Sequence, residues 1–383
     1  MPLTPLLSHA YLIHHTVNKQ RRAFQLAQLP RLGLPFSIVR GYDASVLDEH
    51  VRSCLLPPKR DEADMALREH LWGEVRAAVA AALAEDLGPA GDVTALATVS
   101  LRGGGERVRR AELLAKAGGV LAGTGVVEEV CRAVDPRVRC SWRAVDGARV
   151  ESGDVLGSLE GPALSLLSVE RTALNFLQRM SGIATATAEM VAAAERGGGR
   201  ARVLETRKTA PGLRAVDKWA VVIGGGENHR YGLYDMMLVK DNHIAAAGGV
   251  AEALGAAVDW IEGRGSALEI EVEARTLEEV RQVLRFLDER PGAGEYVKVV
   301  LLDNMAHWEA PGPGEAEGSG RLDTSTLEAG VALVGGRLLT EASGNVTLAT
   351  VGRVAAAGVD RVSCGALTHS VTALDISLNI ALD

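Results

Sequence analysis

Six short apolar segments recur along the second half of the chain, and each ends on a polar, charged or glycine residue. They span residues 203–208, 236–240, 267–273, 297–303, 338–344 and 361–365. Stretches with helical spacing separate or follow most of them, at 213–222, 249–261, 276–287, 345–357 and 368–380. Strands and helices that alternate in this way predict parallel βαβ units. Ligands of such folds bind at the carboxyl ends of the strands.

The predicted strand ends carry cations, carboxylates and glycine turns: Arg207, Lys208, Lys240, Glu273, Asp303, Ser343, Gly344 and Gly365. Arginine and lysine bind carboxylates or phosphates. Carboxylates bind Mg²⁺, accept ribose hydroxyls or act as general bases. Glycine turns before a predicted helix, as at Ser343-Gly344 and Gly365, can hold a phosphate through backbone N–H groups. The pattern therefore predicts an enzyme for an anionic, phosphorylated substrate and a divalent cation.

Each of these residues also has a structural interpretation. Arg207 and Lys208 could be a solvated strand end, since neighbours on a regular strand point to opposite faces. Glu273 and Asp303 could pair with a lysine in a structural ion pair. Glu271 shares the strand parity of Glu273, so it could point inward as well.

Composition narrows the function classes. The 383 residues carry a net charge of −8, which argues against a dedicated nucleic-acid binder. The four cysteines show neither a CxxC pair nor metal-ligand spacing, which favours a reducing compartment, and no apolar run is long enough for a transmembrane helix. His229 and His243 have no third ligand nearby, so spacing disfavours zinc. The glycines at 224–226, before Asn228-His229-Arg230, could let backbone approach a ligand.

The N-terminal residues differ from the rest. Residues 1–42 contain no Asp or Glu, as in an organelle transit peptide, but serine is sparse. Residues 11–13 and 34–39 could instead be short strands, and 11–45 faintly resemble the start of lipopolysaccharide-type glycosyltransferases. Further on, 69–87 and 164–180 predict helices, and 106–160 predicts a small sheet domain. The stretch 309–321 predicts a surface loop.

Short motifs follow one another in a fixed order over residues 73–382. They are Glu85-Asp86-Leu87-Gly88, Gly119 to Gly123, Glu170 to Asn175, Ser181 to Thr185, Thr206 to Thr209, Asn228 to Arg230, Lys240 to His243, Glu271 to Glu273, Leu302 to Asn304, Glu341 to Gly344 and Gly365 to His369. Together they resemble the quinolinate phosphoribosyltransferase family, also called nicotinate-nucleotide pyrophosphorylase (carboxylating).

The resemblance implies an α/β fold of type II phosphoribosyltransferases, with an α/β sandwich N-terminal domain and an incomplete β/α barrel. It divides the chain into an extension of unknown role (1–66), the sandwich domain (67–182), the barrel (183–370) and a C-terminal helical segment (371–383) that packs back on the sandwich. It also implies a homodimer with shared active sites, or a higher oligomer. The extension and the 309–321 insertion depart from the family pattern.

The family reaction converts quinolinate and phosphoribosyl pyrophosphate to nicotinate mononucleotide, pyrophosphate and CO₂ in NAD biosynthesis, with Mg²⁺. By motif, the resemblance implies that Arg207, His229, Arg230, Lys240 and Arg171 of the partner subunit bind quinolinate. It implies that Lys208, Glu273, Asp303, Ser343, Gly344 and Gly365 bind phosphoribosyl pyrophosphate. Lys208, Lys240, Glu273 and Asp303 would be the catalytic group, with Glu273 and Asp303 acting on Mg²⁺.

Three other functions remain open at this point. They are a related transferase acting on nicotinate without decarboxylation, a non-catalytic ligand sensor, and a Schiff-base aldolase using Lys208 or Lys240. The retained cations and carboxylates argue against the first two. We expect no nucleic acid or membrane partner. The expected location is the cytoplasm, with organelle targeting through residues 1–42 as the alternative.

Overall fold

The computed structural model describes residues 10–13, 36–39, 61–309 and 321–380, in two units, 1–70 and 71–383. In the first unit, β1 (Ala10–Ile13) and β2 (Phe36–Val39) form a parallel pair in which Ala10 lies opposite Phe36. The two predicted strands are therefore present where the structure describes them. The interpretations of residues 1–66 as a transit segment or a fused module rest mostly on residues outside the described ranges.

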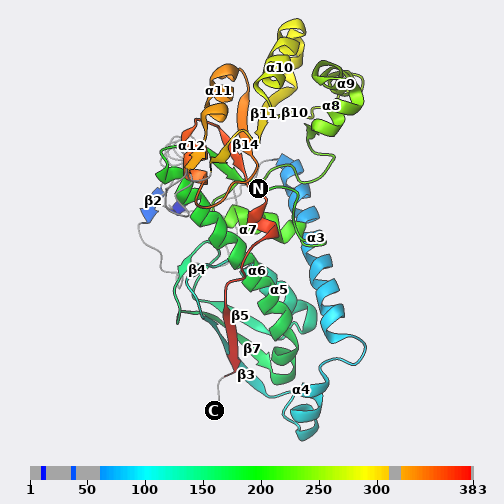
Figure 1. The fold of residues 1–383 in the computed structure, drawn as a ribbon. Helices are drawn as coiled ribbons and strands as arrows, with labels where there is room; N and C mark the ends of the chain where they lie inside the picture. The colour runs from blue at the N-terminus through cyan, green and yellow to red at the C-terminus, as the bar shows by residue number, and fades with distance from the viewer. Residues whose placement is uncertain (1–9, 14–35, 40–60, 310–320, 381–383) are drawn as a thin grey trace. The chain divides into compact units, whose positions relative to one another are not determined.

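An antiparallel sheet forms one core of the second unit. Its order is β16-β3-β7-β5, with β3 at Val108–Ala115, β5 at Arg139–Trp142, β7 at Val155–Pro162 and β16 at Ile376–Ile380. Alternate residues of β3 are buried, as a strand with one face on a core requires. The helices α3 (Asp61–Leu87), α5 (Thr124–Val134) and α6 (Ala163–Arg196) contribute apolar side chains to this core. Figure 1 shows α5 and α6 beside the strands of this sheet.

The smaller elements of this region lie between those strands and helices. They are α4 (Val93–Thr98), the 3-10 helix η3 (Ser100–Arg102), β4 (Gly119–Val120) and β6 (Arg149–Val150). β4 and β6 pair antiparallel. The three described cysteines, Cys131, Cys140 and Cys364, are free.

The C-terminal segment was predicted to be helical, and this prediction is wrong. After the single turn of α13 (Ala366–His369), residues Ile376–Ile380 form β16, antiparallel to β3, with Ile376 opposite Ala115. The sequence of this strand alternates buried Ile376 and Leu378 with more exposed Ser377 and Asn379. That period of two is typical of a half-buried strand, and it outweighed the helical spacing of the wider segment.

Six parallel strands form the second sheet, in the order β8-β15-β14-β11-β10-β9. They are β8 (Arg202–Leu204), β9 (Met237–Val239), β10 (Ile270–Ala274), β11 (Val297–Asp303), β14 (Leu339–Ser343) and β15 (Arg361–Ser363). The first strand pairs with the last, while β8 and β9 do not pair. The sheet therefore curves round and stays open on one side, which is the predicted incomplete β/α barrel.

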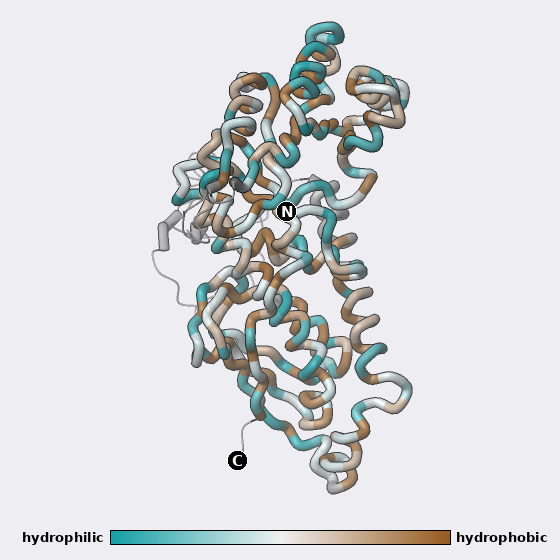
Figure 2. Tube along the Cα trace, in the orientation of Figure 1, coloured by the Kyte–Doolittle hydropathy of each residue, from teal (hydrophilic) through white to brown (hydrophobic). Residues whose placement is uncertain are grey.

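Helices connect the strands of this barrel. They are α7 (Arg214–Ile223), α8 (Asp241–Ala247), α9 (Val250–Glu262), α10 (Leu277–Glu289), α11 (Ser325–Val334) and α12 (Val351–Ala356), with the 3-10 helix η4 at Pro291–Glu295. Brown apolar segments follow the strands and one side of these helices in Figure 2. In α10, for example, one side of the helix is apolar because the buried residues recur at helical spacing, at Val280, Val283, Leu284 and Leu287.

α6 connects the two cores. Its first turns bury Leu166, Val169 and Leu177 in the antiparallel-sheet core, and its last turns bury Met190 and Ala193 in the barrel core. The helix thus runs through residue 182, which was predicted to end the first domain.

The 309–321 insertion is bounded by an antiparallel strand pair. β12 (His307–Glu309) pairs with β13 (Arg321–Asp323), so both end residues of the predicted loop belong to strands. The loop itself, 310–320, lies outside the described residues.

Among the described helices, none is by itself long and apolar enough to cross a membrane, although the bent pair α8 and α9 would pass by length and composition.

Candidate active site

Arg207 and Lys208 follow β8 and are not part of it. β8 ends at Leu204, four residues earlier than the predicted strand end. The chain has therefore left the sheet before Arg207, and strand parity no longer forces the two side chains to opposite faces. Lys208 is exposed, whereas Arg207 is half-buried and its Nε has no hydrogen-bond partner among the described residues. The Thr368 hydroxyl donates to the Lys208 carbonyl at 3.0 Å, which ties this loop to α13.

Two buried charges on α7 hold the loops of the site. Asp217 accepts two hydrogen bonds from Arg179, both at 2.8 Å, and one from the Ala210 N–H at 3.0 Å. Lys218 pairs with buried Glu205 and donates to the His229 carbonyl at 3.0 Å. Sequence reasoning missed these residues. The available signal was an Asp-Lys pair in the middle of an otherwise apolar helix face.

The glycines at 224–226 approach a helix of their own chain. A Cβ on Gly224 would lie 2.5 Å from the Ala184 carbonyl oxygen, and one on Gly226 would lie 2.8 Å from Thr187 Cγ2. Both contacts are too short for any side chain. The close backbone approach predicted for a ligand is therefore made to α6, and it places the following Asn228–Arg230 segment against the barrel.

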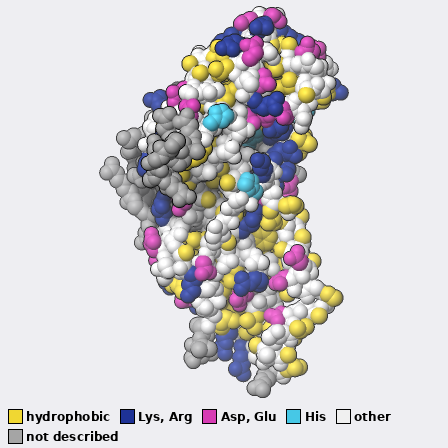
Figure 3. Space-filling model, viewed as in Figure 1, with side chains coloured by type: hydrophobic (Ala, Val, Ile, Leu, Met, Phe, Trp, Pro, Cys, Tyr) yellow, Lys and Arg dark blue, Asp and Glu magenta, His cyan; other side chains and the backbone are white. Residues whose placement is uncertain are grey.

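Arg207 and Arg230 converge. Burial lowers the pKa of Arg230, and the nearby Arg207 guanidinium lowers it further. The contact of Arg230 Nη1 with the Met236 carbonyl is long, at 3.4 Å, so this guanidinium is held weakly. Two like charges near one another, with the Nε of Arg207 lacking a hydrogen-bond partner among the described residues, form a place for an anion. In the view of Figure 3, dark-blue Lys and Arg side chains gather in the middle of the visible face of the molecule, beside histidines.

Lys240, Glu273 and Asp303 form a second group at the ends of neighbouring strands. Lys240 Nζ lies 2.8 Å from Glu273 Oε2, so the structural ion pair considered for Glu273 is present. Lys240 remains 44% exposed in its side chain and so is open to solvent. Burial raises the pKa of Asp303, and repulsion from Glu273 raises it further. A cation would relieve that repulsion.

Ser343, Gly344 and Gly365 lie on the next two strand ends. Ser343 pairs in register with Asp303. Gly344 has φ +99°, and a Cβ there would lie 2.1 Å from Asn304 Oδ1, so only glycine fits. At Gly365 a Cβ would lie 2.9 Å from Lys208 Cδ. The lysine side chain therefore runs over this glycine.

The predicted helix starts at these two glycine turns need correction. α12 begins at Val351 and not at 345, because Asn345 takes φ +52° and Thr347 to Thr350 form a separate turn. α13 spans only Ala366–His369. Helix dipoles thus contribute little here, and a phosphate would rely on the turn N–H groups and Lys208. His369, which sequence reasoning did not assign, also borders Gly365, at 3.1 Å from its ideal Cβ position.

Arg171 stands apart from the strand ends. It lies on α6, where it is exposed, while its neighbours Thr172, Ala173 and Leu174 are buried in the antiparallel-sheet core. Within the part of the chain that the structure describes, it makes no hydrogen bond or ion pair with the other predicted site residues.

His229 points into the barrel. Its Nε2 lies 3.1 Å from Glu271 Oε2 and 3.4 Å from Glu341 Oε1, and both glutamates are fully buried. Burial lowers the pKa of His229, but the two carboxylates raise it more, to about 9. Burial also raises the pKa of Glu271, against the effect of His229. Glu271 thus points inward, as its shared strand parity with Glu273 suggested. Glu341 was not singled out from the sequence.

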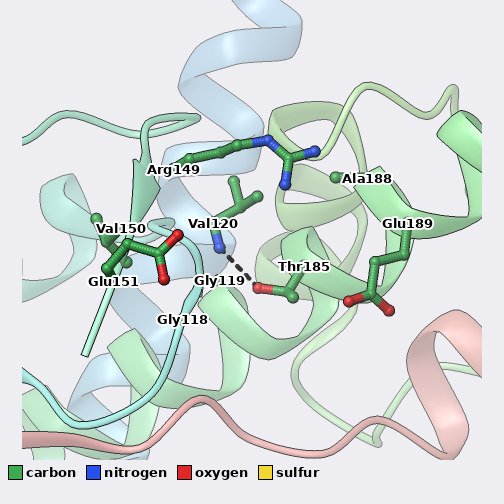
Figure 4. A pocket seen from close by; sticks show the side chains of 9 residues that line it. All are labelled: Gly118, Gly119, Val120, Arg149, Val150, Glu151, Thr185, Ala188 and Glu189. Carbon is green, nitrogen blue, oxygen red and sulfur yellow. Dashed lines mark hydrogen bonds between the residues drawn. The ribbon is translucent and has the colours of Figure 1, made fainter.

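A small cavity lies elsewhere in this unit. Its volume is about 140 Å³, and it is lined by residues of β4, β6 and α6 and their flanks, including Arg149, Glu151, Thr185 and Glu189 (Figure 4). Thr185 Oγ1 accepts the Val120 N–H at 2.8 Å at its floor. None of the predicted site residues lines this cavity.

Comparison with known proteins gives two family matches. Residues 92–181 match the N-terminal domain of quinolinate phosphoribosyl transferase, and residues 183–379 match its C-terminal domain.

Named relatives agree with these matches. The chain is 48% identical over 299 residues to a mitochondrial quinolinate phosphoribosyltransferase [decarboxylating] 2 of Nicotiana glauca, covering 78% of this chain and 80% of that protein. It is 44% identical over 321 residues to the chloroplastic nicotinate-nucleotide pyrophosphorylase [carboxylating] of Arabidopsis thaliana, covering 83% and 87%.

Among solved structures, NadC from Streptococcus pyogenes is similar, with a TM-score of 0.68, 35% identity, and coverage of 81% of this chain and 99% of that chain. The nicotinate-nucleotide pyrophosphorylase of Francisella tularensis gives a TM-score of 0.68 at 31% identity, covering 81% and 96%.

Proposed function

Because the chain belongs to the quinolinate phosphoribosyltransferase family, we propose that it catalyses the decarboxylating transfer of a phosphoribosyl group to quinolinate. The products are nicotinate mononucleotide, pyrophosphate and CO₂, and the reaction belongs to NAD biosynthesis. The observation that carries the proposal is the set of charged groups at the strand ends: Arg207, whose buried Nε has no hydrogen-bond partner among the described residues, lies near Arg230, and Lys240 lies beside Glu273 on the next strands.

The cationic side chains of the site bind the two carboxylates of quinolinate. Arg207 and Arg230 bind one carboxylate through paired N–H groups, which suits the planar fork of arginine. Lys240 and Arg171 of the partner subunit bind the other. The exposed position of Arg171 on α6, without a described partner in its own chain, supports a contact made across a dimer. The active unit is therefore a homodimer with shared sites.

Phosphoribosyl pyrophosphate binds at the neighbouring strand ends. The turns at Ser343-Gly344 and Gly365 hold the 5′-phosphate, and Lys208, whose side chain runs over Gly365, binds the pyrophosphate. Glu273 and Asp303 face the ribose and pyrophosphate, and they would hold Mg²⁺. These residues fit a magnesium ion, because it prefers carboxylate oxygens and because Asp303 and Glu273 repel one another without a cation. When bound, the ion offsets the charge of the pyrophosphate.

The chain supports each chemical step by charge and orientation. The pyridine nitrogen attacks the anomeric carbon as the C–O bond to pyrophosphate breaks. Glu273 and Asp303 stabilise the positive charge that develops on the ribose, and Lys208 stabilises the leaving group. Loss of the C2 carboxylate as CO₂ then leaves an electron pair beside the pyridinium, where Lys240 and Arg230 favour negative charge until the ring carbon is protonated. No covalent nucleophile is required, in contrast to a Schiff-base aldolase.

We place the protein in the cytoplasm. The support is that β1 and β2 form a strand pair within the segment that would otherwise be a transit peptide. The names of the two plant relatives given above describe them as mitochondrial or chloroplastic. A fluorescent fusion to residues 1–66 distinguishes the two locations, since organelle fluorescence would contradict this placement.

The reaction is tested by incubating the purified protein with Mg²⁺, phosphoribosyl pyrophosphate and quinolinate labelled at the C2 carboxyl. We expect one labelled CO₂ for each nicotinate mononucleotide formed, and none when phosphoribosyl pyrophosphate is omitted. Product from nicotinate in place of quinolinate would favour the non-decarboxylating transferase. Borohydride trapping of Lys208 or Lys240 by a carbonyl substrate would favour the aldolase.

A further inference from the structure

Arg214 bonds to both of the loops that carry the paired arginines of the site. It is the first residue of α7, and it is half-buried. Its Nε donates to the hydroxyl of Thr209 at 3.2 Å, two residues after Arg207. Its Nη1 donates to the carbonyl of Tyr231 at 3.2 Å, in the residue directly after Arg230. One guanidinium group therefore joins the two loops at points close to both arginines.

Lys218 joins the same two loops on the other side of the arginines. It lies four positions after the first residue of α7, and residues at that spacing are neighbours on one face of a helix. Lys218 pairs with Glu205, two residues before Arg207. Its Nζ also donates to the carbonyl of His229 at 3.0 Å, in the residue directly before Arg230. Each arginine therefore lies between two points that α7 holds.

The two bridging residues lie at different depths. Lys218 and its partner Glu205 are buried, so the removal of either one leaves an uncompensated buried charge. Arg214 is half-buried, and its two loop contacts are made to neutral oxygens. A substitution of Arg214 therefore weakens the hold on the loops without leaving a carboxylate buried and unpaired.

We propose that Arg214 is a positioning residue that fixes the spacing of Arg207 and Arg230 and thereby prepares the site for a carboxylate of quinolinate. This inference rests on the proposed function. The N–H groups of a guanidinium leave a planar fork in fixed directions, so Arg214 holds the Thr209 hydroxyl and the Tyr231 carbonyl at a set separation. The charge of Arg207 lowers the pKa of Arg230, which shows that the two groups repel one another. Without the bridge, that repulsion favours a wider and less regular spacing.

The bridge acts on quinolinate binding more than on phosphoribosyl pyrophosphate binding. Lys208, which we assign to the pyrophosphate, has anchors of its own. Its N–H donates to the Thr206 hydroxyl at 3.1 Å, and its carbonyl accepts the Thr368 hydroxyl at 3.0 Å. The guanidinium of Arg230, in contrast, makes a long contact of 3.4 Å with the Met236 carbonyl. Loss of the bridge therefore displaces Arg230 before it displaces Lys208.

The test begins with two variants of Arg214 in the full-length protein. In Arg214→Ala we expect KM for quinolinate to rise about tenfold, as the loss of a hydrogen bond to a charged group predicts. KM for phosphoribosyl pyrophosphate and kcat should change much less. Arg214→Lys keeps the charge, but a single nitrogen replaces the fork, so this variant should show most of the same rise. A wild-type KM for quinolinate in Arg214→Lys would mean that charge and not spacing matters, and it would overturn the proposal.

A double-mutant cycle separates the bridge from a general loss of packing. Thr209→Val removes the acceptor of the Nε bond at nearly unchanged side-chain volume, and we expect KM for quinolinate to rise several-fold. The double variant with Arg214→Ala should be no worse than Arg214→Ala alone, because both changes break the same bond. Independent, multiplying effects would contradict the bridge. Thr209→Val also covers the case in which Arg214→Ala fails to fold, since an unchanged KM in folded Thr209→Val would overturn the proposal.

Arg202→Ala is the matched control. Arg202 also bonds the second loop, through Glu227 at 3.0 Å, but this ion pair is exposed and contributes little. We expect no change in KM for quinolinate. The same rise in Arg202→Ala as in Arg214→Ala, or an equal rise of both KM values in Arg214→Ala, would show that Arg214 is merely structural. If the wild type forms no nicotinate mononucleotide, the proposed function fails. If it forms the product while Arg214→Ala keeps the wild-type KM for quinolinate, only this inference fails.

Discussion

Asp135 beside the antiparallel sheet and Asp303 at the barrel are two carboxylates with opposite surroundings. Asp135, beside the antiparallel sheet, accepts hydrogen bonds from the backbone and guanidinium of Arg137 and from the Ser165 hydroxyl. These donors hold the pKa of Asp135 well below its usual range. At the barrel, Asp303 has its pKa raised by burial and by Glu273.

The difference separates structure from function. A carboxylate whose own chain supplies every donor stabilises the fold and needs nothing from outside. Charges that remain buried against like charges, as at Arg207 with Arg230 and at Glu273 with Asp303, cost stability in the free protein. A bound ligand of opposite charge removes that cost. The comparison therefore assigns ligand binding to the barrel, and the following changes test it.

Arg171→Ala should have the largest effect. We expect it to abolish activity without loss of fold, because the arginine is exposed and would act only in the partner's site. Mixing Arg171→Ala with Lys240→Ala subunits should restore activity in mixed dimers, which carry one intact site. Arg196→Ala, at the exposed end of the same helix, is the control and should remain active. If mixed dimers stay inactive, the cross-subunit assignment is wrong.

Arg230→Ala should weaken quinolinate use by about ten- to a hundredfold or more, because a charged hydrogen bond in a shielded site contributes about 1.5–3 kcal/mol. kcat/KM for phosphoribosyl pyrophosphate should change much less, since its partners lie on other strand ends. Arg264→Ala, an exposed arginine stacked on Trp260, is the control. An equal loss for both substrates in a folded protein would mean that Arg230 serves the phosphate or the structure.

Asp135→Asn should lower the free energy of unfolding by about 2 kcal/mol at pH 7 without changing KM for either substrate. The folded pKa of Asp135 is depressed, so its contribution is fully present above the unfolded pKa of about 4 and is lost as pH falls. The difference from wild type should therefore shrink on acidification. Urea unfolding at pH 7 and pH 3 measures it, and a difference that stays constant would contradict the assignment.

Deletion of residues 1–66 should have the smallest effect on catalysis, because every matched motif lies beyond them. The test is kcat/KM of the truncated protein for both substrates. Loss of activity in a soluble, folded truncation would show that the extension is part of the enzyme.

Much of the fold followed from periodicity. The strand at 297–303 was predicted with its observed bounds, because five of its seven residues are buried and it ends on a carboxylate. The β16 segment was missed because a five-residue alternation was read within a longer stretch of helical spacing. The early end of β8 at Leu204 was missed for a different reason. The loop that carries Arg207 and Lys208 is held by Asp217 of α7, through the Ala210 N–H, and by Thr368 of α13, which is distant in sequence.

The site was predictable where its residues end strands, as Glu273 and Asp303 do. The charged residues that hold the loops of the site could not be predicted. Asp217, Lys218 and Glu205 lie within apolar segments, and only the tertiary structure shows that they hold the loops of Thr206 to Ala210 and Asn228 to Arg230. Glu341 was quoted only as part of a motif, because no local pattern shows which buried side chain a strand residue will face.

The most direct test is the unfolding midpoint of the wild-type protein as quinolinate or nicotinate is added. A ligand that binds the folded state alone raises the midpoint in proportion to its affinity. Since the barrel brings several cations together at its strand ends, we predict that the dianion quinolinate raises the midpoint at far lower concentration than the monoanion nicotinate. The shift should persist in Asp135→Asn, whereas Arg230→Ala should need about ten- to a hundredfold more quinolinate or higher still for the same shift. Equal shifts for the two ligands, or none for quinolinate, would contradict the account.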